Sequence, residues 1–502
     1  MVCLMRYITG EERTQLNLIP KSLDDMISED NIVRVIDALV DTFDMNVMKF
    51  THAVPKATGR KPYDPRDLLK LYIYGYYYSI RTSRKLERES HRNIELMWLI
   101  NNLKPDFKTI ADFRKDNGPA LIRSFKQFRL ICDELNLIGK EVLAVDGSKF
   151  KANNSRRRNL TKRKVQKILV HYETLARQYL DSLDQEESET LPKALSQDEL
   201  LQKLNEINHK IAEYELIAAE IERTGEISLT DPDSKHMSVS NNGTDISHNV
   251  QIVVDKENHL VTTIDVISSP ADQGQLYSMV EKAVDDLEIK VSSEDEYKVT
   301  VLADKGYYVY DDLVKCKENK IKAIVPKQKS PSTTGYQEYS KDYFTYDSEK
   351  NCYYCPQGQK LSCISKSTTK DKKYRNFSAC QKCESKSKCT KKERGRTILR
   401  SSKQVVYDEF DQHLKTNKEL YKERQMIVEH PFGTVKRALG YTYFLTCGNA
   451  KVKAESALHF LIYNLKRVIN ILGFKNLMSY LKAHFCVNYK YIVFYRTLSL
   501  RT

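Results

Sequence analysis

The chain lacks any apolar run long enough to cross a bilayer. Leu71–Ile80 is too short, and Ala457–Gly473 is interrupted by two adjacent basic residues. The sequence also lacks a secretory signal at its start and a glycine-rich phosphate loop. We therefore expect a soluble, cytoplasmic protein with no membrane partner, no nucleotide cofactor and no ATP-driven step.

Acidic residues are in deficit. The 502 residues include 81 Lys and Arg against 67 Asp and Glu, a formal charge of +14. Such a surplus suits a polyanionic partner, although many basic proteins bind none. Residues 327–400 hold 18 Lys and Arg against 7 Asp and Glu, so most of the excess lies in this one segment.

The order of predicted elements indicates a mixed α/β protein. Residues 1–138 have helical periodicity, and Asp64-Pro65 is typical of a helix start. Residues 139–326 alternate strands and helices in the order of an RNase H-like core, interrupted by a helical insertion at 156–228. Within this core we expect strands ending at Asp146 and Asp304, a β-hairpin at 247–255 and 260–267, helices at 271–287 and 310–320, and a last strand at 323–326.

The remaining residues divide into three parts. Residues 327–403 form a basic, cysteine-rich insertion, and 404–483 are helices that would complete the core. Residues 484–502 are a tail of unassigned role.

Three acids form the most informative pattern. Asp146 and Asp304 each end an apolar run, and Glu429 lies on a later helix. An acid just past a buried strand lies at the edge of the sheet where open α/β folds place their sites. Taken alone, Asp-Gly more often marks a turn, with the glycine supplying a positive φ. The set of three carboxylates beside basic sequence instead favours a site for hard divalent cations that acts on phosphodiesters.

The helix that carries Glu429 also carries a base. At about 100° per residue, Glu429 and Lys436 project roughly 20° apart, so both side chains can face one cleft. Pro431 removes a backbone hydrogen bond and is expected to kink the helix just past the acid.

Two basic stretches favour contact with DNA. One predicted helix face carries Arg81, Arg84, Lys85, Arg88 and Arg92, although a solvated surface is the commoner explanation of such a stripe. The segment 147–172 contains nine Lys and Arg, beginning with Lys149, and no acid. Because this segment starts directly after Asp146, we expect it to lie along a phosphate backbone.

Six of the eleven cysteines fall in the basic insertion. Their spacing is Cys352-x2-Cys355, then Cys363, then Cys380-x2-Cys383-x5-Cys389. Paired Cys-x2-Cys motifs in a cytosolic protein favour a structural zinc ion bound by four thiolates. Reduced free thiols or a site that has lost its metal are the alternatives. A pure knuckle arrangement would use Cys352 and leave out Cys389, and Cys363 could also substitute.

Several strings together resemble the DDE transposases of bacterial insertion sequences, in the large branch with a Tyr-Arg-Glu-Lys signature (the IS-four superfamily, IS-eleven-eighty-two-like branch). The strings are Ala144-Val-Asp146-Gly-Ser, Leu302-Ala-Asp304-Lys-Gly-Tyr-Tyr, Val428-Glu429-His-Pro-Phe-Gly-Thr-Val-Lys436 and, nearer the start, Lys61-Pro-Tyr-Asp-Pro, Ser83-Arg84-Lys-Leu-Glu87 and Asp106-Phe-Lys-Thr-Ile-Ala-Asp-Phe-Arg114. One departure is that four residues separate Arg424 from Glu429, whereas the signature has three.

The resemblance implies a function and a set of roles. Asp146, Asp304 and Glu429 would hold two Mg²⁺ ions, with Mn²⁺ as a substitute, while Lys436, Arg424 and Tyr421 would contact DNA. The enzyme would cleave the ends of its element and join the released 3′-hydroxyl to target DNA.

The resemblance also implies partners and further sites. The substrate would be double-stranded DNA, both element ends and target, bound by a homodimer at the bacterial nucleoid. Residues 1–138 would bind the element ends. Cys355, Cys380, Cys383 and Cys389 would hold zinc in a ribbon-like insertion, with Cys352 as a possible substitute. Asn249 and Gln251 match positions that line the family's cleft, and Asp231 and Asp233 match a family turn.

Two other functions stay open from the sequence. One is a DNA-binding repressor that has lost catalysis, and the other is a nuclease that only hydrolyses. Retention of all three acids argues against the first, whereas formation of joined products would exclude the second.

Overall fold

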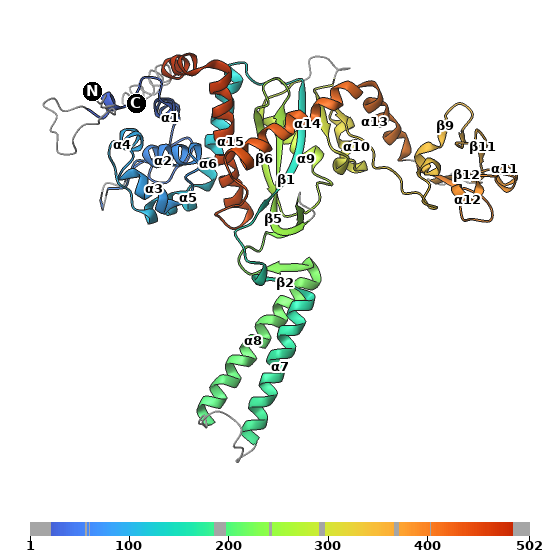
Figure 1. Cartoon of the computed structure of the whole chain (residues 1–502), viewed down its shortest axis with the longest axis horizontal. Coiled ribbons are helices and arrows are strands. Elements are labelled where there is room, and N and C mark those ends of the chain that lie inside the picture. Colours follow the sequence, from blue (N-terminus) through green and yellow to red (C-terminus); the bar gives the residue numbers. More distant parts are fainter. Residues whose placement is uncertain are drawn as a thin grey trace, which may run out of the picture. The chain divides into compact units, whose positions relative to one another are not determined.

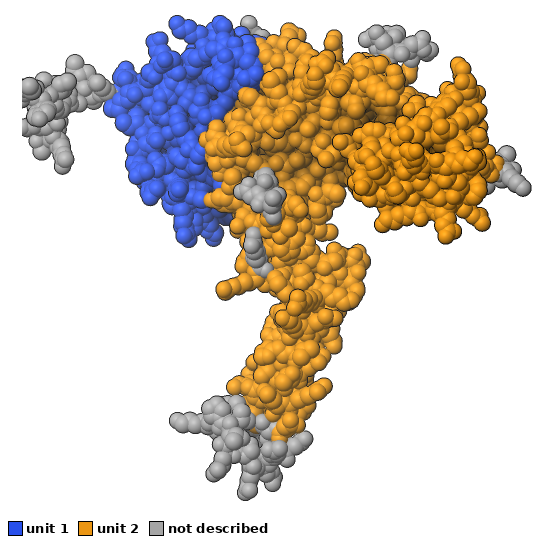
Figure 2. Space-filling view, turned by 45° about the vertical axis from the view of Figure 1, so that its right-hand side comes forward, with its two compact units in different colours: residues 1–127, 465–502 blue, residues 128–464 orange. Residues whose placement is uncertain are grey.

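A computed structural model describes residues 22–55, 58–59, 61–184, 197–239, 243–290, 297–365, 371–401 and 403–484. The chain forms two compact units (Figure 2): Met1–Gln127 with Leu465–Thr502, and Phe128–Asn464. The residues from Leu465 onward thus group with the N-terminal unit, although the sequence assigned 404–483 to the core. Most of the predicted tail, 485–502, lies outside the described residues.

The first unit is helical, as predicted. Its main helices are α1 (Ile32–Asp41), α2 (Pro65–Tyr77), α3 (Ser83–Ser90), α4 (Ile94–Leu99), α5 (Phe107–Asp116) and the start of α6 (Gly118–Glu134). The predicted helix start at Asp64 is confirmed, because its carboxylate accepts a hydrogen bond from the Arg66 amide and Pro65 follows it. The rings of Tyr72 and Phe113 stack in the core, with centroids 5.8 Å apart.

The second unit is built on a six-stranded mixed sheet (Figure 1). The strands run in the order β6–β5–β1–β7–β8, and β4 pairs with the beginning of β5. β1 is antiparallel to β5 and parallel to β7, and β7 is parallel to β8. The bounds are β1 Val142–Lys151, β4 Lys235–Val239, β5 Gly243–Asp255, β6 Val261–Ile267, β7 Val299–Ala303 and β8 Ile321–Ile324. The mixed α/β class is therefore as predicted, while β4 was missed.

Five helices accompany the sheet. They are α9 (Leu276–Asp286), α10 (Tyr310–Glu318), α13 (Gln404–Thr416), α14 (Lys418–Gly433) and α15 (Asn449–Leu472). α9 packs on β5 and β6, α13 packs on β8, and α14 crosses β1, β5 and β7. The first of these helices was predicted from residue 271, but its first turn starts five residues later, which leaves a loop after β6.

Two long helices occupy the predicted helical insertion. α7 (Lys162–Asp184) and α8 (Gln197–Thr224) lie side by side (Figure 1), and their base is closed by a short ladder between β2 (Asn159–Thr161) and β3 (Glu226–Ser228). Leu160, Val165 and Ile221 form a small buried cluster at this base. The hairpin therefore has a hydrophobic contact of its own.

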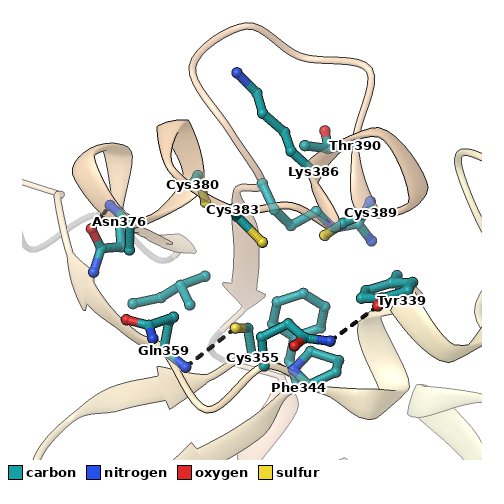
Figure 3. A pocket seen from close by; sticks show the side chains of 15 residues that line it. Tyr339, Phe344, Cys355, Gln359, Asn376, Cys380, Cys383, Lys386, Cys389 and Thr390 are labelled. Atoms are coloured by element: carbon teal, nitrogen blue, oxygen red, sulfur yellow. Dashed lines mark hydrogen bonds between the residues drawn. The ribbon is translucent and has the colours of Figure 1, made fainter.

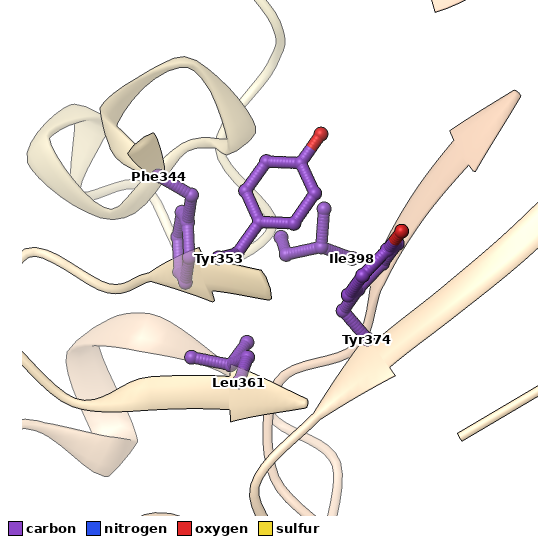
Figure 4. Packing of buried hydrophobic residues seen from close by; sticks show 5 residues of the cluster. All are labelled: Phe344, Tyr353, Leu361, Tyr374 and Ile398. Atoms are coloured by element: carbon purple, nitrogen blue, oxygen red, sulfur yellow. The ribbon is translucent and has the colours of Figure 1, made fainter. Parts of the chain in front are cut away.

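The cysteine-rich insertion contains a second, smaller sheet, which we call the ribbon. Its five antiparallel strands are β9 (Thr345–Asp347), β10 (Cys352–Tyr354), β11 (Lys360–Cys363), β12 (Asp371–Arg375) and β13 (Ile398–Ser401), with α11 (Phe377–Gln381) and α12 (Lys386–Cys389) between the last two. Figure 4 shows its buried cluster, which consists of Phe344, Tyr353, Leu361, Tyr374 and Ile398. This is a very small core for a sheet of five strands.

Across the described ranges, no helix combines the length and the apolar character that a bilayer crossing requires.

Candidate active site

The register of the large sheet places Asp146 beside Asp304. The parallel pairing of β1 with β7 ends at Val145 and Ala303, so the two aspartates come next on adjacent strands. The prediction that a strand ends at Asp146 is wrong, because β1 continues to Lys151 against β5. The aspartate instead stands where β7 stops. Asp304 turns out of its strand and caps a short 3₁₀ turn, accepting a hydrogen bond from the Lys305 amide at 2.7 Å.

α14 brings a guanidinium to this pair. The Nη1 atom of Arg424 lies 3.9 Å from Oδ2 of Asp146, and the two side chains are 15% and 26% exposed. Burial raises the pKa of Asp146 to about 6; Arg424 opposes this shift, and nearby Asp272 and Asp304 add to it. The guanidinium therefore does not fully offset the cost of burying this carboxylate, and a bound cation would stabilise its ionised form.

Tyr421 lies one turn before Arg424 on the same side of α14. The Tyr421 phenol is half-buried, and this burial is the main reason why its pKa is raised. Arg424 opposes this rise in pKa, and the charges of Asp304 and Asp146 add to it. Tyr421 and Arg424, which the resemblance assigned to DNA contact, thus line the candidate site.

Glu429 does not join the two aspartates. Its carboxylate is exposed and accepts a hydrogen bond from Nε2 of Gln425 at 2.7 Å. It follows Arg424 by five residues, about 140° around an ideal helix, while Val428 takes the buried position. In the part of the chain that the structure describes, no three His, Cys, Asp or Glu side chains stand close enough together to hold a metal ion.

Pro431 lies inside α14, and the helix does not end there. The helix continues through Pro431 to Gly433 and then widens into a π-helical turn, η6 (Thr434–Ala438). Such turns recur at functional sites because they change which face of a helix a side chain occupies. The expectation that Lys436 and Glu429 project together is therefore not met.

Lys436 instead points to the continuation of β1. Its Nζ donates to the Ser148 hydroxyl and to the Lys149 carbonyl, each at 2.7 Å, and lies 4.4 Å from the Phe150 ring centroid. Burial, followed by the charge of Lys149, lowers the pKa of Lys436 to about 8. The ammonium is thus held two residues along the strand from Asp146.

Asp272 is a member of the site that the sequence did not reveal. It lies in the loop between β6 and α9, and its Oδ1 accepts hydrogen bonds from Lys149 Nζ (3.0 Å), Asn249 Nδ2 (2.7 Å) and Gln251 Nε2 (2.8 Å). Gln251 in turn accepts from the buried Tyr307 hydroxyl. The sequence signal that could have indicated Asp272 is an acid shortly after the hairpin, in Ser-Ser-Pro-Ala-Asp. The predicted helix at 271–287 included this aspartate, so the signal was not recognised.

Gly147 is a strand residue whose missing side chain lets Gln251 and Asp272 lie close to the β1 backbone. It pairs with Gln251 across β1 and β5, and its φ is not positive, so the turn interpretation of Asp-Gly is wrong. A Cβ on Gly147 would lie 2.1 Å from Gln251 Nε2 and 2.6 Å from Asp272 Oδ1. The glycine beside Asp146 therefore provides space.

The predicted basic face is only partly exposed. Arg84 and Arg88 are exposed on α3, as is Lys85, and Arg92 is exposed just beyond it. Arg81 precedes the helix and is only 7% exposed, so its inclusion in an exposed DNA-binding stripe is wrong. Lys149 is paired with Asp272 and is 15% exposed, so it faces the interior of the site rather than an open surface.

Four of the ribbon cysteines face one cavity. Figure 3 shows Cys355, Cys380, Cys383 and Cys389 around a space of about 30 Å³. Burial raises the pKa of the Cys389 thiol, and the other three thiols contribute to the same shift. Cys352 is 1% exposed on β10 and does not line the cavity, so the arrangement that uses it in place of Cys389 is not the one observed.

The backbone around these thiols is shaped to hold them. The Gln359 amide donates to Cys355 Sγ at 3.4 Å, as Figure 3 shows. Gly395 has φ +79°, and a Cβ there would lie 2.4 Å from Cys380 Cβ. Four thiols are the kind of donor set that zinc prefers, but among the described residues they do not stand close enough together to hold a metal ion.

Comparison with known proteins gives two matches. Residues 21–116 match the family described as Transposase domain (DUF772), and residues 354–469 match the family described as Transposase DDE domain. Together these matches support a DDE transposase. No curated protein and no solved structure matches the chain.

The two matched segments include much of what the geometry singles out. The first spans α1 to α5 of the helical unit, and the second spans five of the six ribbon cysteines, α14 and most of α15. A DDE transposase domain implies the use of divalent metal in general. Arg424, Glu429 and Lys436 all lie within the second match.

Proposed function

We propose that the protein is a DNA transposase that binds the terminal repeats of an insertion sequence, cleaves the element ends by metal-dependent hydrolysis and joins the 3′-hydroxyl to target DNA. The observation that carries this proposal is the placement of Asp146 and Asp304 on adjacent parallel strands, beside Arg424 of α14. The transposase matches at both ends of the chain support it.

The strand order supports an RNase H-like core. An antiparallel hairpin, β5 and β6, lies on one side of β1, and two parallel strands, β7 and β8, lie on the other. This is the arrangement expected of that fold from the order of elements along the chain. It puts the first two acids at the centre of the sheet.

The carboxylate oxygens of Asp146 and Asp304 suit Mg²⁺ or Mn²⁺, which prefer hard oxygen ligands. Glu429 is the proposed third ligand and would have to exchange its hydrogen bond with Gln425 for the metal. Two divalent cations, when bound, orient the attacking oxygen and stabilise the leaving oxygen.

The basic side chains of the site would hold the DNA. Nη1 of Arg424 is buried and has no hydrogen-bond partner within the described ranges, so it can donate to a phosphate oxygen. Lys436, still mostly charged at neutral pH, would contact phosphate near the cut, with Tyr421 beside it. Water and then the 3′-hydroxyl act as nucleophiles, so no covalent protein–DNA intermediate is required.

We further propose that the ribbon binds zinc through Cys355, Cys380, Cys383 and Cys389 and presents basic residues to DNA. The exposed Arg84 and Arg88 of α3 would contact the element end. Cleaving two ends in one complex requires at least a homodimer.

The decisive experiment is cleavage of a labelled duplex that carries the flanking element end, in Mg²⁺, Mn²⁺ or EDTA. We expect metal-dependent release of a 3′-hydroxyl at the element boundary, lost in Glu429→Gln. Glu419 is exposed in the first turn of α14 and provides the matched control. The Glu419→Gln variant should cleave normally.

Each other outcome identifies a different function. Specific binding without cleavage by the wild type would favour a repressor. Cleavage without joined products on an added plasmid would favour a nuclease. Full activity of Glu429→Gln would remove this residue from the catalytic set.

A further inference from the structure

A large groove lies between the ribbon and α13. Its volume is about 1090 Å³, far larger than the cysteine cavity. One wall carries three tyrosines of the ribbon sheet, and the other carries polar residues of α13. No role has so far been attached to this groove.

Cations outnumber acids along the groove, and the acids are already engaged. Asp342 pairs with Lys327 at 3.3 Å, and Asp408 pairs with Arg400 at 2.6 Å. Asp411 accepts a hydrogen bond from the Tyr308 hydroxyl at 2.9 Å. The negative charge within the groove is therefore largely used by these contacts.

Three other lysines line the groove: Lys341, Lys372 and Lys415. Among the described residues, no carboxylate oxygen lies within 4.0 Å of their ammonium groups. The Lys341 ammonium is half-buried, and its closest polar contact is a weak one with Gln404 Oε1 at 3.4 Å. Burial lowers the pKa of Lys341, and the charges of Lys327 and Arg400 lower it further, while Asp342 and Asp408 oppose the shift. An anion beside it would relieve the repulsion among these cations.

Arg400 is held rigidly in the wall. Its guanidinium lies 3.7 Å from the Tyr346 ring centroid, and its Nη1 donates to the Tyr353 hydroxyl at 3.2 Å. The rings of Tyr346, Tyr353 and Tyr374 pack on one another, with centroids 5.0–6.1 Å apart. The tyrosine rings are thus in contact with one another and with Arg400. The groove therefore offers fixed positive charge rather than free aromatic rings on which bases could stack.

The groove is joined to the loop that follows Asp304. Tyr308, four residues after that aspartate, donates to Asp411 in the α13 wall, and its ring stacks on Tyr407 at 5.2 Å. Gln328, next to Lys327 of the groove, donates to the Lys305 carbonyl at 3.5 Å. The loop after Asp304 is therefore in direct contact with residues that line or adjoin this groove.

We infer that the groove between the ribbon and α13 binds the phosphate backbone of DNA beyond the cleavage site, with Lys341 and Lys372 as its principal contacts. The inference rests on the proposed function for the identity of the polyanion. Recognition is by charge, so it should be independent of sequence.

The test measures binding of the full-length protein to a labelled duplex between about 50 and 200 mM salt. The Lys341→Gln, Lys372→Gln double variant should weaken binding by about 3- to 30-fold and reduce the slope of log affinity against log salt by roughly 1–2. The matched control is Lys391→Gln, which removes one exposed ribbon charge outside the groove. Its affinity should stay within about 2-fold of wild type. Equal losses in the double variant and the control would overturn the inference.

A second readout needs no variant. Mild amine labelling followed by mass spectrometry should show Lys341 protected by DNA, while Lys391 labels equally with and without it. Protection by inorganic phosphate alone would mean a small-anion site and would overturn the DNA assignment.

The two proposals fail separately. If Asp304→Asn still cleaves, the catalytic assignment is wrong, yet groove variants that bind weakly would keep the groove as a DNA site. If cleavage is metal-dependent as proposed but the groove variants bind like wild type, only the groove inference falls.

Discussion

Asp146 and Asp304 are positioned by backbone hydrogen bonds between buried strands, whereas the four ribbon cysteines stand in turns and at the ends of short helices. β1 and β7 pair in register up to the residue before each aspartate. Cys355 follows β10, Cys380 lies in a helix of five residues, and the buried hydrophobic cluster of the ribbon has five members among the described residues. The acid pair is therefore set by the sheet, while the thiol set depends on what it binds.

This difference predicts different responses to the loss of a ligand. A core as small as that of the ribbon contributes little stability by itself, so small domains of this kind commonly rely on a metal. The large sheet buries ten consecutive residues of β5 and the apolar residues of β1 and β7 that precede the aspartates, so we expect it to fold without a metal. Removing zinc should change the structure, and removing a catalytic acid should change only the chemistry.

The largest expected effect is therefore loss of zinc. Cys383→Ser, or treatment with a strong chelator, should unfold the ribbon, because structural zinc contributes on the order of 10 kcal/mol to such folds. Limited proteolysis should then cut within residues 339–401 while the large sheet stays resistant. Cys352→Ser is the control, because that thiol does not line the cavity, and it should retain about one zinc per chain. Zinc lost from both variants would reopen the choice of ligands.

Substitution of an acid comes next. Asp304→Asn should reduce end cleavage by about 10³-fold or more, corresponding to about 4 kcal/mol, because the carboxylate's charge is lost at the reacting phosphate. The thermal unfolding profile should stay close to wild type, and DNA should still bind. A large drop in melting temperature would show that the aspartate is structural.

A methyl group beside Asp146 should have a smaller effect. Gly147→Ala places a Cβ against Gln251 and Asp272, and we expect a loss of about 1–3 kcal/mol in unfolding free energy. In Gly306→Ala the nearest atom is Asp272 Cβ at 4.0 Å, so that variant should differ from wild type by less than about 0.5 kcal/mol. Chemical denaturation of the pair measures the difference. Equal stabilities would mean that the network adjusts freely.

The smallest effect concerns pH. Burial raises the pKa of Asp146 to about 6, so its ionisation destabilises the metal-free protein as pH rises from about 4 to 6. In EDTA, Asp146→Asn should be more stable than wild type by about 1–2 kcal/mol at pH 8, a figure reduced for partial exposure, and equally stable near pH 4. Mg²⁺ should stabilise wild type and not the variant. A difference unchanged between the two pH values would contradict this origin.

The sequence indicated the helical unit, the hairpin of β5 and β6 and the two strand aspartates because these depend on local periodicity. It did not reveal the extension of β1 past Asp146, because Gly-Ser-Lys is a poor strand sequence and only pairing with β5 keeps it extended. Asp272 was missed for a related reason. Its hydrogen-bond partners lie on two strands, Lys149 on β1 and Asn249 and Gln251 on β5. Only the pairing of these strands brings the three side chains together.

The position of Glu429 also depended on tertiary structure. The helical wheel assumed ideal turns from Glu429 to Lys436, but the π-helical turn that follows Gly433 changes the angle between them. The prediction that Arg81 is exposed was wrong for a simpler reason. It applied helical spacing to a residue that precedes α3.

The hairpin of α7 and α8 is long, and its base is narrow. A helix of 28 residues is about 42 Å long at 1.5 Å per residue. The ladder at its base is only three residue pairs wide. A rotation of about 5° at that base moves the far end of the helix by roughly 4 Å. Such a displacement would be comparable to the rise of one base pair.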